Sequence, residues 1–371
     1  MIYADNAATT KLDMNAFEAM KHFLIEDYSN ASQPYSFSRK AKEALKEARS
    51  TIANCIGATP DEIFFTSGGT ESDNWAIKGM MKYGEKQSIL TSQIEHHAIL
   101  NACAFMEEMG NLVSYLPVDK CGIVSSEILR KYITNRTKLV SIMLVNNEIG
   151  SIEPIKELVG IAKEQGVLFH TDAVQAIGHI PIDVKELSVD MLSGSGHKFN
   201  GPKGVGFLYI RKGTQLNSYA NGGAQEFGMR AGTENVAAIV GMAKALEFNC
   251  REMNNAKNKL IQMEASFIQV LNEAEIDYLR NGAEQHVPGN VNISIKGVSG
   301  EMLLHRLDLK GICISTGSAC DSENTQISHV IKGIGVPNEY AEGTIRVSFG
   351  RDNNKNDSIE VAKAIVNILK S

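Results

Sequence analysis

One lysine stands in a setting that is unusual for a surface lysine. Lys198 ends the run SGSGHK (193–198), which follows an apolar stretch. Small residues allow a ligand to approach closely, and an amine there could form a Schiff base, with Ser195 and His197 beside it to bind a phosphate. Taken alone, the motif is also compatible with an ordinary lysine, because most lysines lie at the surface. Lys203 is a competing amine in a predicted turn.

A glycine-rich turn follows the short apolar strand predicted at 62–66. The run SGGTES (67–72) opens a helical stretch, and its small residues, Gly69 and Thr70 among them, let backbone N–H groups approach a phosphate. No GKS or GKT follows, so this is not a Walker-type nucleotide loop. An ordinary strand-to-helix turn with a Ser or Thr cap is the alternative.

Two charged side chains are predicted on strands. Asp172 comes at the carboxyl end of the strand at 167–171, where open α/β sheets place their ligands. It either caps a helix or pairs with a protonated heteroaromatic nitrogen. Arg346, in the predicted strand 344–349, either binds a substrate carboxylate through its fork of donors or lies in solvent on an edge strand.

Cys320 differs from the other five cysteines in its setting. It lies in the small, polar run GSACDS (317–322), where a thiol has the access that a nucleophile needs. Cys121 precedes a glycine in a turn and is also expected to be exposed. The remaining cysteines occur in helical or apolar patterns and are expected in the core: Cys55, Cys103, Cys250 and Cys313. With no CxxC pair, reduced thiols are expected rather than a disulfide framework.

Two adjacent histidines begin a helical run after Glu95. The ring of His96 could stack on a flat cofactor. Adjacent residues do not share a helix face, so His96 and His97 are not expected to bind a metal together. The sequence has no HExxH motif and no Cys/His cluster, so no metal site is predicted.

The elements that must position these residues alternate between helix and strand. This alternation predicts an α/β fold with a largely parallel sheet. We expect a helix over 38–56 and strands at 139–145, 205–210 and 291–295. A long helical pattern from Asn235 to about Ala274 is expected to connect a large domain to a smaller C-terminal one, with the boundary near residue 252.

Composition limits the class of protein. The 371 residues exceed what one core usually serves, which favours two domains. A net charge of −6 argues against nucleic acid or an anionic membrane as the main partner. No apolar run has the length of a membrane span, and residues 1–10 do not resemble a signal peptide. A cytoplasmic location is therefore expected.

In chain order, these motifs resemble the class-V aminotransferase group of fold-type I pyridoxal-phosphate (PLP) enzymes, and within it the cysteine desulfurases of the NifS and IscS type. The matching runs are 3–10, 65–72, 95–96, 146–150, 170–175, 195–198, 230–233, 317–320 and 344–346. The resemblance implies a large domain (14–252) with a mainly parallel seven-stranded sheet. It also implies a small α+β domain, made of 1–13 and 253–371, that carries the Cys320 loop.

The resemblance implies roles for individual residues. Lys198 holds PLP and removes the substrate Cα proton, His96 moves protons, and Cys320 takes the sulfur of L-cysteine as a persulfide. The other implied contacts are Asp172 at the ring nitrogen, His96 stacked on the ring, Asn147 and Gln175 at the ring oxygen, Gly69, Thr70, Ser195 and His197 at the phosphate, Thr233 at the phosphate of the other subunit of a homodimer, and Arg346 with Asn30 at the substrate carboxylate. A protein acceptor, for iron–sulfur cluster assembly or for tRNA or cofactor thiolation, is the implied partner.

The sequence departs from the family pattern in three places, one of them Ile327, where a proline is common. Within 30–39, Tyr35 and Ser38 replace a histidine and a glycine that are usual there, which bears on the substrate-side contacts. The chain ends at Ser371 without the tail by which IscS-type proteins dock their scaffold, so a dedicated acceptor is an alternative. The alternative functions are a selenocysteine lyase, a C–S β-lyase, an aminotransferase, or a non-catalytic binding protein, because a fold does not fix a reaction.

Overall fold

The largest element of the protein is a seven-stranded sheet. The structure, a computed structural model, describes residues 1–80, 86–316 and 327–371. In spatial order the strands are β2 (Ile63–Thr66), β8 (Gly206–Ile210), β7 (Met191–Ser195), β6 (Leu168–Asp172), β5 (Thr137–Ser141), β3 (Ser88–Ser92) and β4 (Leu112–Leu116). All neighbours run parallel except β8, which is antiparallel to β2 and β7. The predicted mainly parallel, seven-stranded α/β fold is confirmed.

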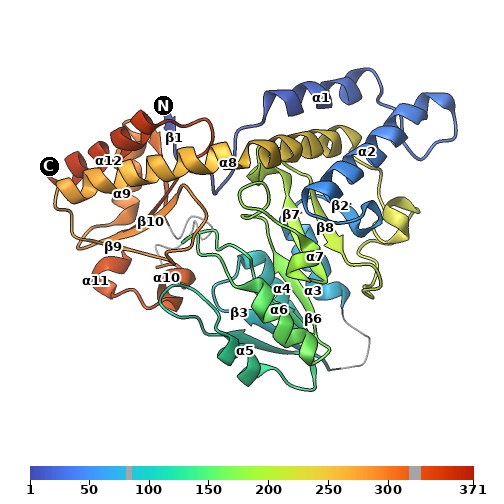
Figure 1. Cartoon of the computed structure of the whole chain (residues 1–371), viewed down its shortest axis with the longest axis horizontal. Helices are drawn as coiled ribbons and strands as arrows, with labels where there is room; N and C mark the ends of the chain where they lie inside the picture. Colours follow the sequence, from blue (N-terminus) through green and yellow to red (C-terminus); the bar gives the residue numbers. More distant parts are fainter. Residues whose placement is uncertain (81–85, 317–326) are drawn as a thin grey trace.

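Helices surround this sheet, and one of them extends far beyond it. Figure 1 shows α8 (Val236–Glu273) running most of the length of the molecule. The other helices are α1 (Met14–Ile25), α2 (Arg39–Cys55), α3 (Gly69–Gly79), α4 (His97–Glu108), α5 (Ser126–Tyr132), α6 (Ile155–Glu164), α7 (Val184–Leu187), α9 (Gly300–Asp308), α10 (His329–Gly333), α11 (Asn338–Ala341) and α12 (Lys355–Leu369). In the described part of the chain, none of the helices is long and apolar enough to cross a bilayer.

A second, smaller sheet is formed by four strands from the C-terminal third of the chain. Its order is β12 (Ser315–Thr316), β13 (Thr344–Ser348), β10 (Asn290–Ile295) and β9 (Tyr278–Arg280), all antiparallel, while β1 (Ile2–Tyr3) pairs with β11 (Ile312–Cys313). Along α8, Leu246 belongs to the apolar cluster of the large sheet and Leu260 to that of the small sheet. The predicted boundary near residue 252 falls between them, although the exact division stays a prediction.

Most of the predicted elements are found within one or two residues of their expected ends, including α2 and α8. The strand expected at 139–145 is an exception, because β5 ends at Ser141. Ile142 and Leu144 remain buried, and a run of apolar residues indicates burial without showing where a strand ends. The side chain of Asn146 accepts hydrogen bonds from the backbone two and three residues ahead, which turns the chain.

A buried ion pair joins α2 to the loop before α8 and also contacts β2. Glu226, with a side chain only 3% exposed, forms a bidentate pair with Arg49 of α2 at 2.7 and 2.8 Å. The same carboxylate accepts a hydrogen bond from the backbone N–H of Phe65, at 2.8 Å. Because β2 leads directly into the glycine-rich turn, this pair helps to fix the turn.

Replacing Glu226 with glutamine is expected to destabilise the protein. The change leaves the largely buried Arg49 guanidinium without a countercharge, a loss worth about 3–5 kcal/mol in comparable buried pairs. The measurement is the midpoint of the first urea unfolding transition. The matched control is Glu164→Gln, which breaks the exposed pair with Arg130 and should leave the midpoint nearly unchanged. Equal shifts in both variants would contradict the prediction.

Candidate active site

Most of the predicted site residues line one cavity of about 340 Å³. The cavity lies at the carboxyl ends of β6 and β7, the edge at which parallel α/β sheets bind ligands. Ten predicted residues contribute to its wall: Gly69, Thr70, His96, Asn147, Asp172, Gln175, Ser195, His197, Lys198 and Arg346. The structure therefore brings together residues that lie up to 277 positions apart in sequence, the span from Gly69 to Arg346.

Lys198 is placed by a short 3-10 turn, Gly196–Lys198, directly after β7. Its Nζ donates hydrogen bonds to the carbonyl oxygens of Ala7 and Ala8, at 2.6 and 2.9 Å. No other lysine lines this cavity among the described residues. Lys203, the competing amine, is exposed to solvent. The structure therefore favours Lys198 over Lys203 as the Schiff-base lysine, a choice that the sequence leaves open.

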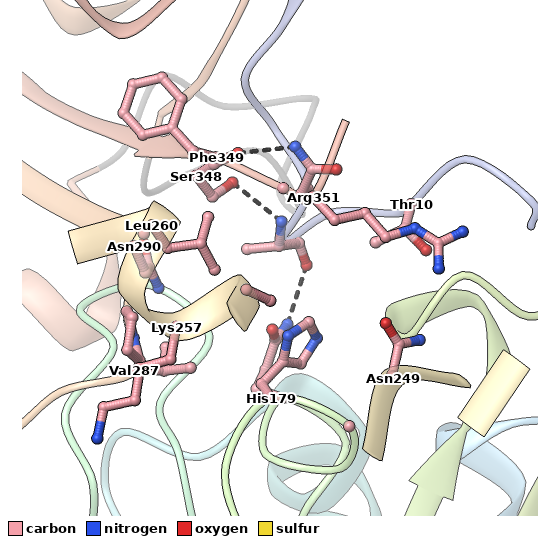
Figure 2. Close-up of a pocket in the computed structure, with 18 of the residues that line it drawn as sticks. Thr10, His179, Asn249, Lys257, Leu260, Val287, Asn290, Ser348, Phe349 and Arg351 are labelled. Atoms are coloured by element: carbon pink, nitrogen blue, oxygen red, sulfur yellow. Dashed lines mark hydrogen bonds between the residues drawn. The ribbon is translucent and has the colours of Figure 1, made fainter. Parts of the chain in front are cut away.

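The backbone at Ala7 joins Lys198 to the second sheet. The Ala7 N–H donates to Ser348 Oγ at 2.9 Å, and Gln175 Nε2 donates to the Ala7 carbonyl at 2.9 Å. Ser348 and His179 lie on the wall of a second, smaller cavity of about 60 Å³, shown in Figure 2. The amine of Lys198 therefore sits where the N-terminal segment crosses between the two sheets.

Asp172 is a buried carboxylate at the end of β6. Burial raises its pKa to about 6, although a hydrogen bond from the Val174 N–H (2.9 Å to Oδ1) and the charge of Lys198 both act to lower it. A cationic heteroaromatic nitrogen beside it would favour the ionised form. The carboxylate is thus suited to pair with a protonated ring nitrogen.

Two further carboxyl groups near the cavity were missed by the sequence analysis. Asp73, in α3, lines the cavity, and its pKa is raised well above normal by burial and by Asp172. Burial also raises the pKa of Glu95 to about 8, although its Oε1 accepts from Ser92 Oγ (2.7 Å) and the Met143 N–H (3.0 Å). The spacing of Gly69 and Asp73, one helical turn, was the available signal for Asp73.

His96 caps the start of α4. Its Nδ1 accepts a hydrogen bond from the Ala98 N–H at 3.1 Å, so the neutral ring carries its hydrogen on Nε2. Burial lowers the pKa of His96 to about 4, and the charges of Lys198 and His97 contribute. At neutral pH the ring is uncharged, which suits stacking on a flat ligand and donation of a hydrogen bond from Nε2.

The start of α3 forms the anion-binding end of the cavity. Gly68, at φ +153°, precedes the helix, and among the described residues no side chain caps it, so the first N–H groups are available to an anion. Thr70 and Ser195 add hydroxyl groups. His197 Nδ1 contacts Thr9 Oγ1 at 3.1 Å, and burial lowers the His197 pKa to about 4.

Arg346 is a buried arginine on β13. It donates from Nη1 to the Asn147 carbonyl at 2.9 Å and from Nη2 to Asp5 Oδ1 at 2.7 Å. Its Nε has no hydrogen-bond partner in the described part of the chain. A buried guanidinium with an unused donor at the cavity wall is suited to bind a carboxylate. The interpretation as a solvent-exposed edge arginine is wrong.

Three predicted site residues are not part of this cavity as described. Asn30 accepts a hydrogen bond from the Ser32 N–H at 2.8 Å in its own turn, and Thr233 is exposed. Thr233 was expected to act on the other subunit, so both roles stay predictions. Cys320 lies outside the described residues. The nearest described residue before it, Thr316, lines the cavity.

Comparison with known proteins supports the same chemistry. Residues 2–360 match the Aminotransferase class-V family. Cysteine desulfurase IscS of Dictyoglomus turgidum is 48% identical, with 100% of this chain and 95% of that protein covered. Cysteine desulfurase IscS of Methanosarcina thermophila is 47% identical, with coverage of 100% and 92%.

Solved structures agree with this result. A NifS-like protein superposes with a TM-score of 0.94 and 36% identity, covering 100% of this chain and 99% of its own. The structure of SspA in complex with cysteine superposes with a TM-score of 0.85 and 35% identity, covering 94% and 99%. The class-V aminotransferases and cysteine desulfurases are PLP enzymes. The chain therefore belongs to the class-V aminotransferase family, among its cysteine desulfurases of the NifS and IscS type.

Proposed function

We propose that the protein is a PLP-dependent cysteine desulfurase that converts L-cysteine to L-alanine and carries the released sulfur on Cys320. The observation that carries the proposal is the convergence of Lys198, Asp172 and the uncapped start of α3 on one cavity. These three features fit the three ends of PLP: its aldehyde, its ring nitrogen and its phosphate. Thr70, Ser195 and His197 hold the phosphate, while His96 covers the ring.

Bound PLP supplies a ring that withdraws electrons from the Cα of an amino acid. Within the same cavity, the Lys198 amine takes the Cα proton, and His96 donates a hydrogen bond from Nε2. Arg346, on the wall of the cavity, holds the substrate carboxylate. The Cys320 thiolate then attacks the substrate sulfur, so that an S–S bond forms while the Cβ–S bond breaks. Protonation at Cβ leads to L-alanine.

Described residues that precede and follow the segment with Cys320 lie at the cavity or bond to its wall. Thr316, before it, lines the cavity. Ser328, after it, donates from Oγ to Glu148 Oε1 at 2.8 Å, and Glu148 also lines the cavity. The positions of Thr316 and Ser328 support a role for Cys320 in sulfur transfer. We propose that the sulfur passes to an acceptor protein and that the enzyme is a homodimer in which Thr233 completes the partner's phosphate site.

Product analysis tests this function directly. Purified protein loaded with PLP is given L-cysteine and a thiol reductant, and L-alanine, sulfide, pyruvate and ammonia are measured. A desulfurase forms L-alanine and sulfide in equal amounts and no pyruvate. Pyruvate with ammonia would identify a C–S β-lyase, and a sulfur-containing keto acid would identify an aminotransferase. Absence of any product would leave only a binding protein.

Replacing Arg346 with lysine is expected to raise KM for L-cysteine more than it lowers kcat. Lysine keeps the positive charge and loses the planar fork of donors, which costs about 1.5–3 kcal/mol for a hydrogen bond to a charged group. The expected loss in kcat/KM is therefore about 10- to 100-fold. Steady-state kinetics with varied L-cysteine give both constants.

The matched control for this change is Arg351→Lys. Arg351 also pairs with a buried carboxylate, that of Asp13, yet it lines the smaller cavity of Figure 2 and not the one with Lys198. Its KM should stay close to that of the wild type. An unchanged KM in Arg346→Lys, or the same change in both variants, would rule out Arg346 as the carboxylate ligand.

A further inference from the structure

One turn of the chain holds Lys198 by its backbone and, through Ala7, by its amine. The turn is formed by residues 173–179, directly after β6. Gln175 donates from Nε2 to the Ala7 carbonyl at 2.9 Å, and the same carbonyl accepts a hydrogen bond from Lys198 Nζ at 2.6 Å. At the end of the turn, Nε2 of His179 lies 3.0 Å from the carbonyl oxygen of Lys198. His179 has no part in the function proposed above.

The imidazole of His179 is the donor in this contact. A carbonyl oxygen only accepts, so Nε2 carries a hydrogen and donates it to the backbone of Lys198. Burial lowers the pKa of His179, and the charge of Lys198 lowers it further, although the hydrogen bond acts in the opposite direction. The ring is therefore neutral at neutral pH, with its one hydrogen on Nε2. Figure 2 shows this ring on the wall of the smaller cavity.

A glycine brings this turn against the backbone that follows Lys198. Gly178 has a φ of +78°, in the left-handed region that favours glycine. A Cβ atom at this position would lie only 2.9 Å from the Cβ of Phe199. The close approach of the two segments therefore depends on the absence of a side chain at Gly178. It places the next residue, His179, within hydrogen-bond distance of the Lys198 carbonyl.

The carbonyl groups on either side of the Lys198 carbonyl are bonded by other segments. The preceding carbonyl accepts a hydrogen bond from Oγ1 of Thr10 at 2.7 Å. The following carbonyl accepts one from Nδ2 of Asn249, in α8, at 2.5 Å. Three successive carbonyl groups are thus bonded by side chains from three separate parts of the chain. Because His179 bonds the carbonyl of the lysine itself, its effect on Lys198 can be separated from that of Asn249.

We propose that His179 is a positioning residue for Lys198. Its hydrogen bond fixes the direction of the Lys198 peptide group, while the Ala7 carbonyl receives the amine at the other end of the side chain. An amine that takes a proton works efficiently only when it is held close to the productive geometry. His179 does not line the larger cavity as described, so it acts through the lysine. This role rests on the proposed function, because it concerns the lysine that holds PLP.

The rate at which PLP attaches to the full chain tests this role without any substrate. Protein freed of PLP is mixed with PLP again, the visible absorbance of the lysine-bound form is followed, and borohydride reduction with peptide mapping locates it. His179→Phe keeps a flat ring and removes the donor, so attachment to Lys198 should slow by about tenfold, the upper range for one lost hydrogen bond. His179→Gln keeps an N–H donor and should restore most of the wild-type rate.

Turnover of the PLP-loaded enzyme gives a second readout. In His179→Phe, kcat for L-cysteine should fall by about tenfold, while KM stays close to that of the wild type because Arg346 is unchanged. Deuterium at Cα should slow this variant more than it slows the wild type, since proton removal by Lys198 becomes the slower step. Asn249→Leu is the matched control, because it removes the donor at the next carbonyl. Equal changes in both variants would indicate only a loosened turn and would overturn the proposal.

The tautomer of His179 can be read in the wild type. Nitrogen NMR of the PLP-loaded protein, labelled in its histidines, reports which ring nitrogen carries the hydrogen, and the His179 signals are those missing from His179→Gln. A hydrogen on Nδ1 alone would overturn the bond to the Lys198 carbonyl. If PLP does not attach to Lys198 in the wild type, the proposed function fails. If it does attach, and His179→Phe matches the wild type in attachment rate and kcat, only the positioning role is overturned.

Discussion

The Lys198→Ala variant is expected to lose desulfurase turnover by about 10⁴-fold, the upper end of the effect of a positioned acid–base group, and to lose covalent attachment of PLP. Lys198 is the sole lysine in the cavity among the described residues, so no neighbouring amine can replace it. The variant should still bind PLP noncovalently, because the start of α3 and Asp172 are unchanged. This variant therefore separates noncovalent PLP binding from desulfurase turnover.

Borohydride reduction followed by peptide mapping measures the attachment. The wild type should yield a peptide with PLP fixed to Lys198, and Lys198→Ala should yield none. Lys203→Ala is the matched control, because that amine lies five residues away and is exposed. It should keep both attachment and turnover. PLP fixed to Lys203, in any variant, would mean that the cavity does not hold the catalytic lysine.

The sequence predicts the fold well where local pattern and burial agree. The helical stripe of α2 and the long pattern of α8 are found as expected, because amphipathic periodicity reports directly on which face is buried. The positions of Asp172 and Lys198 also follow from local signals, since Asp172 ends β6 and Lys198 lies in the turn directly after β7. The carboxyl edge of such a sheet is a known place for ligands.

Contacts between distant segments could not be predicted in this way. Arg346 pairs with Asp5, 341 positions away, and Lys198 donates to Ala7 and Ala8. The carbonyls of Ala7 and Ala8 carry no chemical signature, because a backbone carbonyl is present in every residue. Asp5 is one of 43 acidic residues in the chain, and nothing in its local sequence marks it as the partner of Arg346. For Asp73 the only local signal is its spacing of one helical turn from Gly69, and this spacing does not show by itself that the carboxyl group faces a cavity.

Two of the cysteines show the same limit of prediction from the sequence. The helical pattern indicated that Cys55 and Cys250 face inward, and both do pack against the core of the large sheet. Periodicity does not report how completely neighbouring helices cover a position, and both thiols retain partial exposure.

The Cys320→Ala variant is expected to bind PLP and L-cysteine as the wild type does and to release no sulfide. Its loss of turnover should be of the same order as that of Lys198→Ala, because the thiolate is the nucleophile that breaks the Cβ–S bond and alanine cannot replace it. The measurements are sulfide and L-alanine release with a thiol reductant, together with the absorbance change of PLP when L-cysteine is added.

Cys121→Ala serves as the control, since Cys121 is an exposed thiol outside the cavity, and it should retain full activity. The absorbance change separates two causes of inactivity. If Cys320→Ala responds to L-cysteine and forms no product, the thiol acts after substrate binding and carries the sulfur. If the variant keeps releasing sulfide and forms pyruvate, elimination from the substrate needs no thiol, and the chain is a C–S β-lyase built on a desulfurase scaffold.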